Sequence, residues 1–424
     1  MVEQSPASRG NLAQIASEFR AHRDPGQALD ARTSAVDSIV IKAVESYLSP
    51  KIPAKFAMAA VGGYGRRELF PYSDVDLLLV FESEADLTGI KEALSECWRV
   101  LWDAGLRVSH SVRTIAECCK LNDQNTELHV SLLDLRFLYG DPGVFASLSG
   151  RLPEFYQRHA QTFTRRLAEL ARERHSKYNS TVYHLEPNIK EAPGGIRDIH
   201  LLRWLSQLGP RQEVLKESLQ ELEGSRDFLF ALRCFLHLAT NRDNNLLTFE
   251  LQDQVAQALP LQPIDPEQWM RLYYQSARQV FQPTLRALDH VESHDPSLFR
   301  QLRDLRTRLS TSEFTISKDR VFLRNQAETF RSADSLFRLF TFVAKHGLRL
   351  SWDTQRRLRA SAKELETAMR VHPVGREAWR ELLSQPHTAL ALREMQETAL
   401  LGIAIPEWNE VDSLVVRDFY HRYT

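Results

Sequence analysis

The spacing of apolar residues predicts helices at both ends of the chain. Up to about residue 48, apolar residues such as Ile39, Val44 and Leu48 recur at near-helical spacing, and Ser49 and Pro50 then close the segment. From about residue 150 onward the helical period dominates again. We therefore predict an N-terminal helical segment at 1–48, a helical domain at 146–330 and a C-terminal helical region at 331–424.

Three short segments between these helical parts have the pattern of β-strands. Residues 56–61 and 75–81 are almost entirely apolar and are bounded by Gly, Pro and Ser, and the second reads as a central strand buried on both faces. Residues 106–112 alternate between apolar and polar side chains, which predicts a third strand. The fold class that follows is α+β, with a small sheet domain at 49–145 embedded in a mostly helical chain.

Composition agrees with a helical majority and narrows the class of protein. The 424 residues include only 17 Gly and 18 Pro. Together these make up less than the roughly 12% of average usage, so we expect few turns. Lys and Arg number 54 against 55 Asp and Glu, a formal net charge of −1. Proteins that coat nucleic acid or anionic membranes need a basic excess, so we expect neither kind of partner.

Cysteine usage and the N-terminal sequence predict a cytoplasmic protein. The four cysteines form no CxxC pair, which favours a reducing compartment without disulfides or structural zinc. The first ten residues contain no apolar core of a signal peptide, and no stretch approaches the ~18 apolar residues of a membrane span.

The chemistry-bearing segment is a glycine turn followed by two aspartates on one strand. Because strand side chains alternate, Asp74 and Asp76 are expected on the same face, about 7 Å apart. Two neighbouring carboxylates repel each other unless a cation lies between them, and Mg²⁺ is typically held by one or two carboxylates plus substrate phosphates. Gly62 and Gly63 would let backbone N–H groups approach those phosphates, and Arg66 could bind them in a bidentate manner.

The order of these features excludes the commoner phosphate-binding motifs. There is no GxxxxGK[ST] P-loop, and the glycine turn leads to another strand within a dozen residues, which does not fit a dinucleotide fold. An isolated Asp-x-Asp or Gly-Gly is usually only a turn or a cap. Joined at this spacing, with a buried strand behind the aspartates, they indicate metal-dependent nucleotidyl transfer.

Residues 62–76 resemble the nucleotidyltransferase motif of the bacterial PII uridylyltransferase family, a branch of the polymerase-β-like superfamily. Residues 186–200 are very similar to the segment that links the catalytic and helical regions of that family. Further similarity at 105–114, 241–259 and 418–424 extends the resemblance over nearly the whole chain. In this family an HD phosphohydrolase domain and paired ACT domains would follow, so the resemblance places uridylyl removal and glutamine sensing outside these 424 residues.

The resemblance implies Mg²⁺-dependent transfer of UMP from UTP to a tyrosine hydroxyl of a PII nitrogen-signalling protein. Superfamily members often carry a third carboxylate, for which Asp134 is the nearest candidate, although an acid in a helix-like run is more often a surface or ion-pairing residue. The other implied roles divide into metal ligands, Asp74 and Asp76, and groups around the nucleotide phosphates, Gly62, Gly63, Arg66 and Ser73.

Two points in the sequence leave alternatives open. The loop at 187–198 could fold over the triphosphate through Lys190 and Arg197, or it could be a helix-entry turn in which Arg197 and Asp198 pair locally. Arg67 stands where the family commonly has glycine, and it would add a cation near the phosphates. The alternative functions are a nucleotidyltransferase with another nucleotide or acceptor, such as protein adenylylation, and a non-catalytic module that binds nucleotide or a partner.

Overall fold

The computed structural model describes residues 6–84, 90–121, 126–208, 212–293, 314–317, 320–323 and 333–415. These residues form two compact units, one extending to Ala287 and the other spanning Leu288–Leu414. Residues 418–424, which contributed to the family resemblance, lie outside the described residues.

The chain begins with helices α1 (Pro6–His22) and α2 (Pro25–Ala43). Asp24 caps α2 by accepting a hydrogen bond from the Gln27 N–H at 3.1 Å, and Pro25 occupies the first turn, where its missing N–H costs nothing. Two short turns, η1 (Val44–Leu48) and η2 (Ser49–Lys51), then lead to the first strand. The segment expected to be helical is therefore two helices with a short irregular end.

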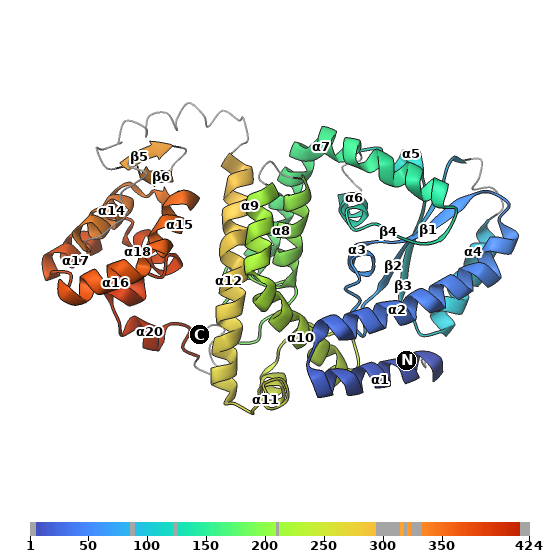
Figure 1. Cartoon of the computed structure of the whole chain (residues 1–424), viewed down its shortest axis with the longest axis horizontal. Helices are drawn as coiled ribbons and strands as arrows, with labels where there is room; N and C mark the ends of the chain where they lie inside the picture. Colours follow the sequence, from blue (N-terminus) through green and yellow to red (C-terminus); the bar gives the residue numbers. More distant parts are fainter. Residues whose placement is uncertain are drawn as a thin grey trace. The chain divides into compact units, whose positions relative to one another are not determined.

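A four-stranded mixed sheet follows, built from β1 (Phe56–Ala60), β2 (Val75–Phe81), β3 (Val108–Thr114) and β4 (Arg136–Gly140) in the order β3-β2-β1-β4 (Figure 1). Strand β1 is antiparallel to β2 and β4, whereas β2 is parallel to β3 across the helix α4 (Lys91–Asp103). The α+β fold class is confirmed. Strand β3 begins two residues later than predicted, and the sequence pattern did not reveal β4.

The sheet domain has one core, and β2 lies at its centre. Val75 and all five residues from Leu77 to Phe81 are buried, whereas Asp76 is partly exposed. Apolar residues of α2, β1 and α4 form one cluster with Val75, Leu77, Leu79 and Phe81 of this strand, and Leu78 and Val80 on its other face are also buried. The two aspartates thus stand at the start of a rigid element.

Helices make up the rest of the first unit, as predicted. Short helices α3 (Gly62–Gly65), α5 (Ile115–Cys118) and α6 (Thr126–Leu132) connect the strands. Longer ones follow the sheet: α7 (Pro142–Lys177), α8 (Ile196–Leu208), α9 (Gln212–Glu221), α10 (Glu223–Thr240), α11 (Phe249–Ala258) and α12 (Pro266–Ser293). The loop before α8 and the loop between α10 and α11 both supply residues to the site described below.

The second unit is helical with a small sheet that the sequence pattern did not predict. Its strands are β5 (Phe314–Ser317), β6 (Arg320–Leu323) and β7 (Arg349–Leu350), in that order. Its helices are α14 (Ala333–His346), α15 (Trp352–Ala360), α16 (Ala362–Val371), α17 (Arg376–Leu383), α18 (Thr388–Glu397), α19 (Leu401–Ala404) and α20 (Trp408–Val411). Gly347 ends α14 with φ of 63°, the left-handed conformation expected of a C′ glycine.

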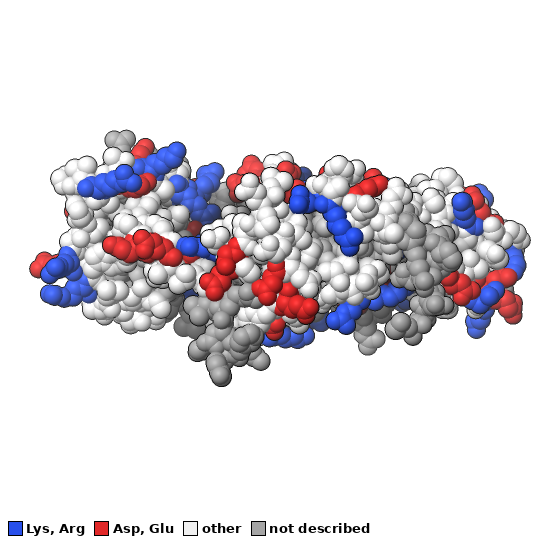
Figure 2. All heavy atoms as spheres, turned by 90° about the horizontal axis from the view of Figure 1, so that it is seen from below, with Lys and Arg blue, Asp and Glu red and all other residues white. Residues whose placement is uncertain are grey.

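Acidic and basic side chains are interspersed on the face of the molecule seen in Figure 2, with no continuous basic area. This distribution agrees with the balanced charge of the sequence. Among the described helices, none combines the length and the apolar character that crossing a bilayer would require.

Candidate functional site

The residues that follow β1 lie close to Asp76 of the neighbouring strand. The Val61 N–H donates to the Asp76 carbonyl at 3.1 Å, and Gly62 follows with φ of 57°. A Cβ atom at Gly62 would lie 3.3 Å from Asp76 Oδ2. Both the left-handed backbone and the close approach therefore favour glycine at this position.

Asp76 is a carboxylate in need of positive charge. Its burial, followed by the negative charge of Asp74, raises its pKa above the ordinary aspartate value. The charges of Lys190, Arg66 and Arg197 oppose this shift without cancelling it. Among the described residues, no hydrogen bond or ion pair is made by the Asp76 side chain. The charge of Asp74 thus acts on Asp76, and the shared cation between them stays a prediction.

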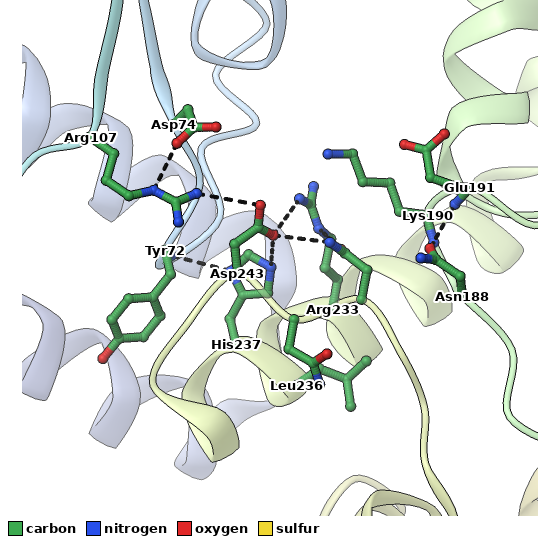
Figure 3. A network of polar contacts seen from close by, with 12 residues as sticks. Tyr72, Asp74, Arg107, Asn188, Lys190, Glu191, Arg233, Leu236, His237 and Asp243 are labelled. Atoms are coloured by element: carbon green, nitrogen blue, oxygen red, sulfur yellow. Dashed lines mark hydrogen bonds and ion pairs between the residues drawn. The ribbon is translucent and has the colours of Figure 1, made fainter. Parts of the chain in front are cut away.

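Asp74 has a different environment, because an arginine contacts it (Figure 3). Arg107 Nε donates to Asp74 Oδ1 at 2.8 Å, and Arg107 Nη2 lies 3.6 Å from Asp243 Oδ2. The Asp74 side chain is nevertheless 54% exposed, so solvent and ions can reach it. Sequence reasoning did not assign a role to Arg107 or Asp243, although both lie in segments that resemble the family.

Asp243, in the loop between α10 and α11, is contacted by nitrogen atoms of three side chains. Its Oδ1 lies 3.2 Å from Arg233 Nη2 and 2.9 Å from His237 Nε2 (Figure 3). Asn245 Nδ2 donates to the same oxygen at 3.0 Å. Burial acts to raise the pKa of Asp243, but the His237 contact and the Arg233 charge outweigh it and keep the pKa well below its usual value. Asp243 is therefore a fixed anion.

His237 is neutral and takes part in this network through both ring nitrogens. Burial lowers its pKa to about 4, against the effect of its contact with Asp243. Its Nδ1 accepts a hydrogen bond from the Tyr72 N–H at 3.2 Å, which leaves the proton on Nε2, the atom facing Asp243. Arg233 and His237 are polar residues four positions apart on the buried face of α10. This spacing was the sequence signal that could have indicated a buried polar network.

The loop at 187–198 is packed in a defined conformation. Asn188 Oδ1 accepts hydrogen bonds from the N–H groups of Lys190 and Glu191 at 3.1 and 2.9 Å (Figure 3). Gly194 has φ of 76°, and a Cβ there would meet the Ala277 carbonyl oxygen at 2.1 Å. A side chain at 194 would therefore displace α12 or the loop.

Lys190 of this loop and Arg197, in the first turn of α8, act on Asp76 electrostatically. Burial lowers the pKa of Lys190, and the charges of Arg233 and Arg197 lower it further, so Lys190 lies in an area of excess positive potential. Arg197 Nη2 lies 3.4 Å from Glu191 Oε1. The local Arg197–Asp198 pair considered from the sequence is not the arrangement found.

Asp198 instead fixes the loop to helix α7. Its side chain is fully buried, pairs with Arg174, lies 2.9 Å from His175 Nε2, and accepts a hydrogen bond from the Gly194 N–H at 2.8 Å. The two neighbouring residues thus have different roles: Arg197 acts on Asp76, and Asp198 holds the loop backbone in place.

Arg66 and Asp134 are placed differently from our expectation. Arg66 is only 5% exposed, with Nη1 2.6 Å from Asp134 Oδ2 and Nε 2.6 Å from Glu68 Oε2. The Asp134 side chain has no solvent access, and Trp204 Nε1 donates to it at 2.9 Å. Asp134 lies in the turn before β4 rather than in a helix. This geometry supports structural roles for both, in place of direct phosphate contact and a third carboxylate.

The same cluster joins the glycine-turn segment to helix α8. His200 Nε2 lies 3.1 Å from Glu68 Oε2 and 3.2 Å from Arg66 Nη2. Burial lowers the pKa of His200 to about 3, so the ring is neutral at physiological pH. Since Arg197 lies in the first turn of α8, the cluster connects the segment between β1 and β2 with the cations near Asp76.

Arg67 and Ser73 complete the predicted segment. Arg67 has φ of 61° and donates through Nε and Nη2 to Asp30 Oδ1 of α2, at 2.8 and 2.6 Å. Its charge is thus used in pairing with α2. Ser73 Oγ, predicted to contact phosphate, is buried with no hydrogen-bond partner among the described residues.

The carboxylates fit a hard divalent cation. Within the described ranges, no group of three or more His, Cys, Asp or Glu side chains is placed to hold a metal ion. Mg²⁺ does not require such a group, because one or two carboxylates usually suffice when phosphates and water complete its shell. The raised pKa of Asp76 and its lack of a bonded partner are the features that a cation would relieve.

A cavity of about 640 Å³ lies away from these residues. Its wall includes Leu132, Phe145, Leu152, Tyr156 and Leu208, from α6, α7 and α8. None of the predicted site residues lines it, so the cavity is no evidence for the nucleotide site.

The sheet and its aspartate pair are the features of a nucleotidyltransferase domain, and comparison with known proteins agrees with this class. The family model described as "Nucleotidyltransferase domain" matches residues 40–132. A second, described as "GlnD PII-uridylyltransferase", matches residues 161–284. The chain belongs to the GlnD PII-uridylyltransferase family.

The curated proteins to which this chain is similar include several that carry the name "Bifunctional uridylyltransferase/uridylyl-removing enzyme". The protein from Burkholderia orbicola strain AU 1054 is 32% identical over 390 residues, covering 88% of this chain and 45% of the relative. The relatives from Haemophilus influenzae strain PittEE and Ralstonia nicotianae are 29% and 30% identical, covering 98% of this chain and 49% of each relative. The chain thus spans about half the length of the curated relatives it matches.

Proposed function

We propose that this chain transfers UMP from UTP to a tyrosine hydroxyl of a PII-type nitrogen-signalling protein and releases pyrophosphate. The observation that carries the proposal is the placement of Lys190 and Arg197 in electrostatic reach of Asp76, beside Asp74. A carboxylate pair under the influence of two cations, one from a loop and one from α8, suits a nucleoside triphosphate with its divalent cation. The names of the relatives support uridylyl transfer as the reaction.

The reaction exchanges a phosphoanhydride bond of UTP for a phosphodiester bond to the tyrosine oxygen. The tyrosine oxygen forms a bond to the α-phosphorus of UTP, the bond from that phosphorus to the α,β-bridging oxygen breaks, and the hydroxyl proton is released to solvent or a base. Asp74 and Asp76 would hold Mg²⁺, which neutralises triphosphate charge and stabilises the leaving pyrophosphate when bound.

The remaining residues would position the triphosphate. Burial lowers the pKa of Lys190, the charges of Arg233 and Arg197 lower it further, and an arriving triphosphate would offset this repulsion. Arg197 offers a second cation, and Ser73 Oγ offers a buried hydroxyl that lacks a partner among the described residues. Arg66, Glu68 and His200 would act indirectly, by holding the glycine turn and α8 together.

The decisive experiment is nucleotide-dependent labelling of a PII-type protein from the same organism. The full chain, Mg²⁺ and α-labelled UTP or ATP are combined with the acceptor, and Asp76→Asn is compared with Asp103→Asn. Asp103 is an exposed acid of α4 paired with Arg99, so it controls for loss of one negative charge.

We expect label from UTP on the acceptor, lost in Asp76→Asn and retained in Asp103→Asn. Transfer from ATP in place of UTP would indicate protein adenylylation. Nucleotide binding without transfer to any acceptor would indicate a non-catalytic module. Full transfer by a folded Asp76→Asn variant would place the active site elsewhere.

A further inference from the structure

Arg107 lies between two carboxylates that come from different parts of the first unit (Figure 3). It contacts Asp74 Oδ1 through Nε at 2.8 Å, whereas its Nη2 remains 3.6 Å from Asp243 Oδ2. The longer distance exceeds that of an ordinary hydrogen bond, so the second contact is an ion pair that could shorten. One guanidinium group thus serves a proposed cation ligand and a second anion at the same time.

The backbone at Arg107 is fixed, but its side chain is free to move. The Val75 N–H donates to the Arg107 carbonyl at 2.8 Å, which fixes the start of β3 beside β2. The Arg107 side chain is 57% exposed. It can therefore change partners without any rearrangement of the sheet.

Asp243 is a permanent alternative partner for this side chain. It remains ionised because Arg233, His237 and Asn245 hold its Oδ1, and its Oδ2 is the oxygen that faces Arg107. The contact with Asp243 is also open to improvement, since the ion pair is still long. An arginine that leaves Asp74 would therefore retain a counter-charge.

We propose that Arg107 is a displaceable counter-ion for Asp74. It neutralises Asp74 while no divalent cation is bound, and it moves fully onto Asp243 when Asp74 takes up the cation. This inference rests on the proposed function, because it requires Asp74 to be a cation ligand. Arg107 and Asp243 are positioning residues here, and they set the affinity of the site for the cation.

The proposal predicts opposite effects of two substitutions on cation binding. Arg107→Gln removes the competitor, so Asp74 becomes available and cation binding tightens. Asp243→Asn removes the alternative partner, so Arg107 stays on Asp74 and cation binding weakens. Since Asp243 acts only through Arg107, the Asp243 substitution has no effect once Arg107 is gone, whereas a general electrostatic effect would add in both backgrounds.

The test measures Mn²⁺ binding to the full chain without nucleotide. Free Mn²⁺ is monitored by its electron paramagnetic resonance signal. We expect Arg107→Gln to lower Kd about two- to fivefold, the scale of a half-exposed ion pair. Arg99→Gln, which removes an exposed arginine of α4 paired with Asp103, is the charge-matched control and should leave Kd unchanged. Asp243→Asn should raise Kd, and the double variant should match Arg107→Gln.

Each outcome decides a different point. Equal Kd values for Arg107→Gln and Arg99→Gln, or additive effects in the double variant, overturn the counter-ion. If Asp243→Asn fails to fold, Arg107→Gln is measured in about 0.5 M KCl, where long-range charge effects are screened. A gain that vanishes there also overturns the proposal. Retention of Mn²⁺ binding in Asp76→Asn would instead contradict the proposed function, whereas absence of Mn²⁺ binding in both the wild type and Arg107→Gln would overturn the counter-ion.

Discussion

Arg66 and Asp134 are 68 residues apart in the chain, yet Arg66 Nη1 lies 2.6 Å from Asp134 Oδ2 in a nearly solvent-free cluster. The pair holds the turn before β4 against the segment that follows the glycine turn. Trp204 of α8 donates to the same Asp134 oxygen, so a helix outside the sheet domain depends on this contact as well. The cluster thus joins three segments of the first unit, and its loss should be detected first as a loss of stability.

Asp134→Ala should therefore lower the free energy of unfolding by about 3–5 kcal/mol, because it leaves the Arg66 charge buried with only Glu68 as an anionic partner. Urea unfolding of the full chain measures the change. Asp103→Ala removes an exposed acid and should cost less than about 1 kcal/mol. If Asp134→Ala were as stable as wild type and yet inactive, Asp134 would have a catalytic role after all.

Lys190→Ala should raise the KM for the nucleotide at least several-fold while changing stability little. Lys190 acts electrostatically on Asp76, and it is buried near other cations. Among the described residues, no anion is bonded to it. Initial rates over a range of nucleotide concentrations measure the effect. Lys55→Ala is the control, since Lys55 is 74% exposed and pairs with Asp141 outside the site. An unchanged KM would remove the loop at 187–198 from the nucleotide site.

Arg67→Gly should leave both the nucleotide KM and the stability close to wild type. Glycine relieves the left-handed conformation at φ of 61°, a gain of about 1 kcal/mol. The variant also loses the exposed pair with Asp30, a cost of about 0.2–1 kcal/mol. Kinetics and unfolding of this variant test the two effects together. A large change in nucleotide preference would instead show that Arg67 acts at the phosphates.

The sequence predicted what depends on local pattern. The strands β1 and β2, the glycine turn and the aspartate pair follow from alternation, apolar runs and backbone requirements within about 25 residues. The roles of Arg66 and Arg107 do not, because the partners that decide them, Asp134 and Asp243, are brought close only by the tertiary fold. Strand β4 was missed for a related reason. Its residues are mostly half-buried at the sheet edge, so they show neither an apolar run nor a clear alternation.

The stability of the first unit should fall as the pH drops from about 6.5 toward 4. Burial lowers the pKa of His200 to about 3 and that of His237 to about 4, whereas both are near 6.5 when the chain is unfolded. In this window the unfolded chain binds more protons than the folded one, so acid favours unfolding, by up to ~1.4 kcal/mol per pH unit for each proton. His200→Gln keeps a donor for Glu68 but cannot titrate, and it should reduce the slope by about one proton. Denaturant midpoints at pH 7, 6 and 5 measure it, with His22→Gln, on the helix α1, as the control. Equal slopes for the wild type and His200→Gln would mean that His200 is not held in its neutral form by the fold.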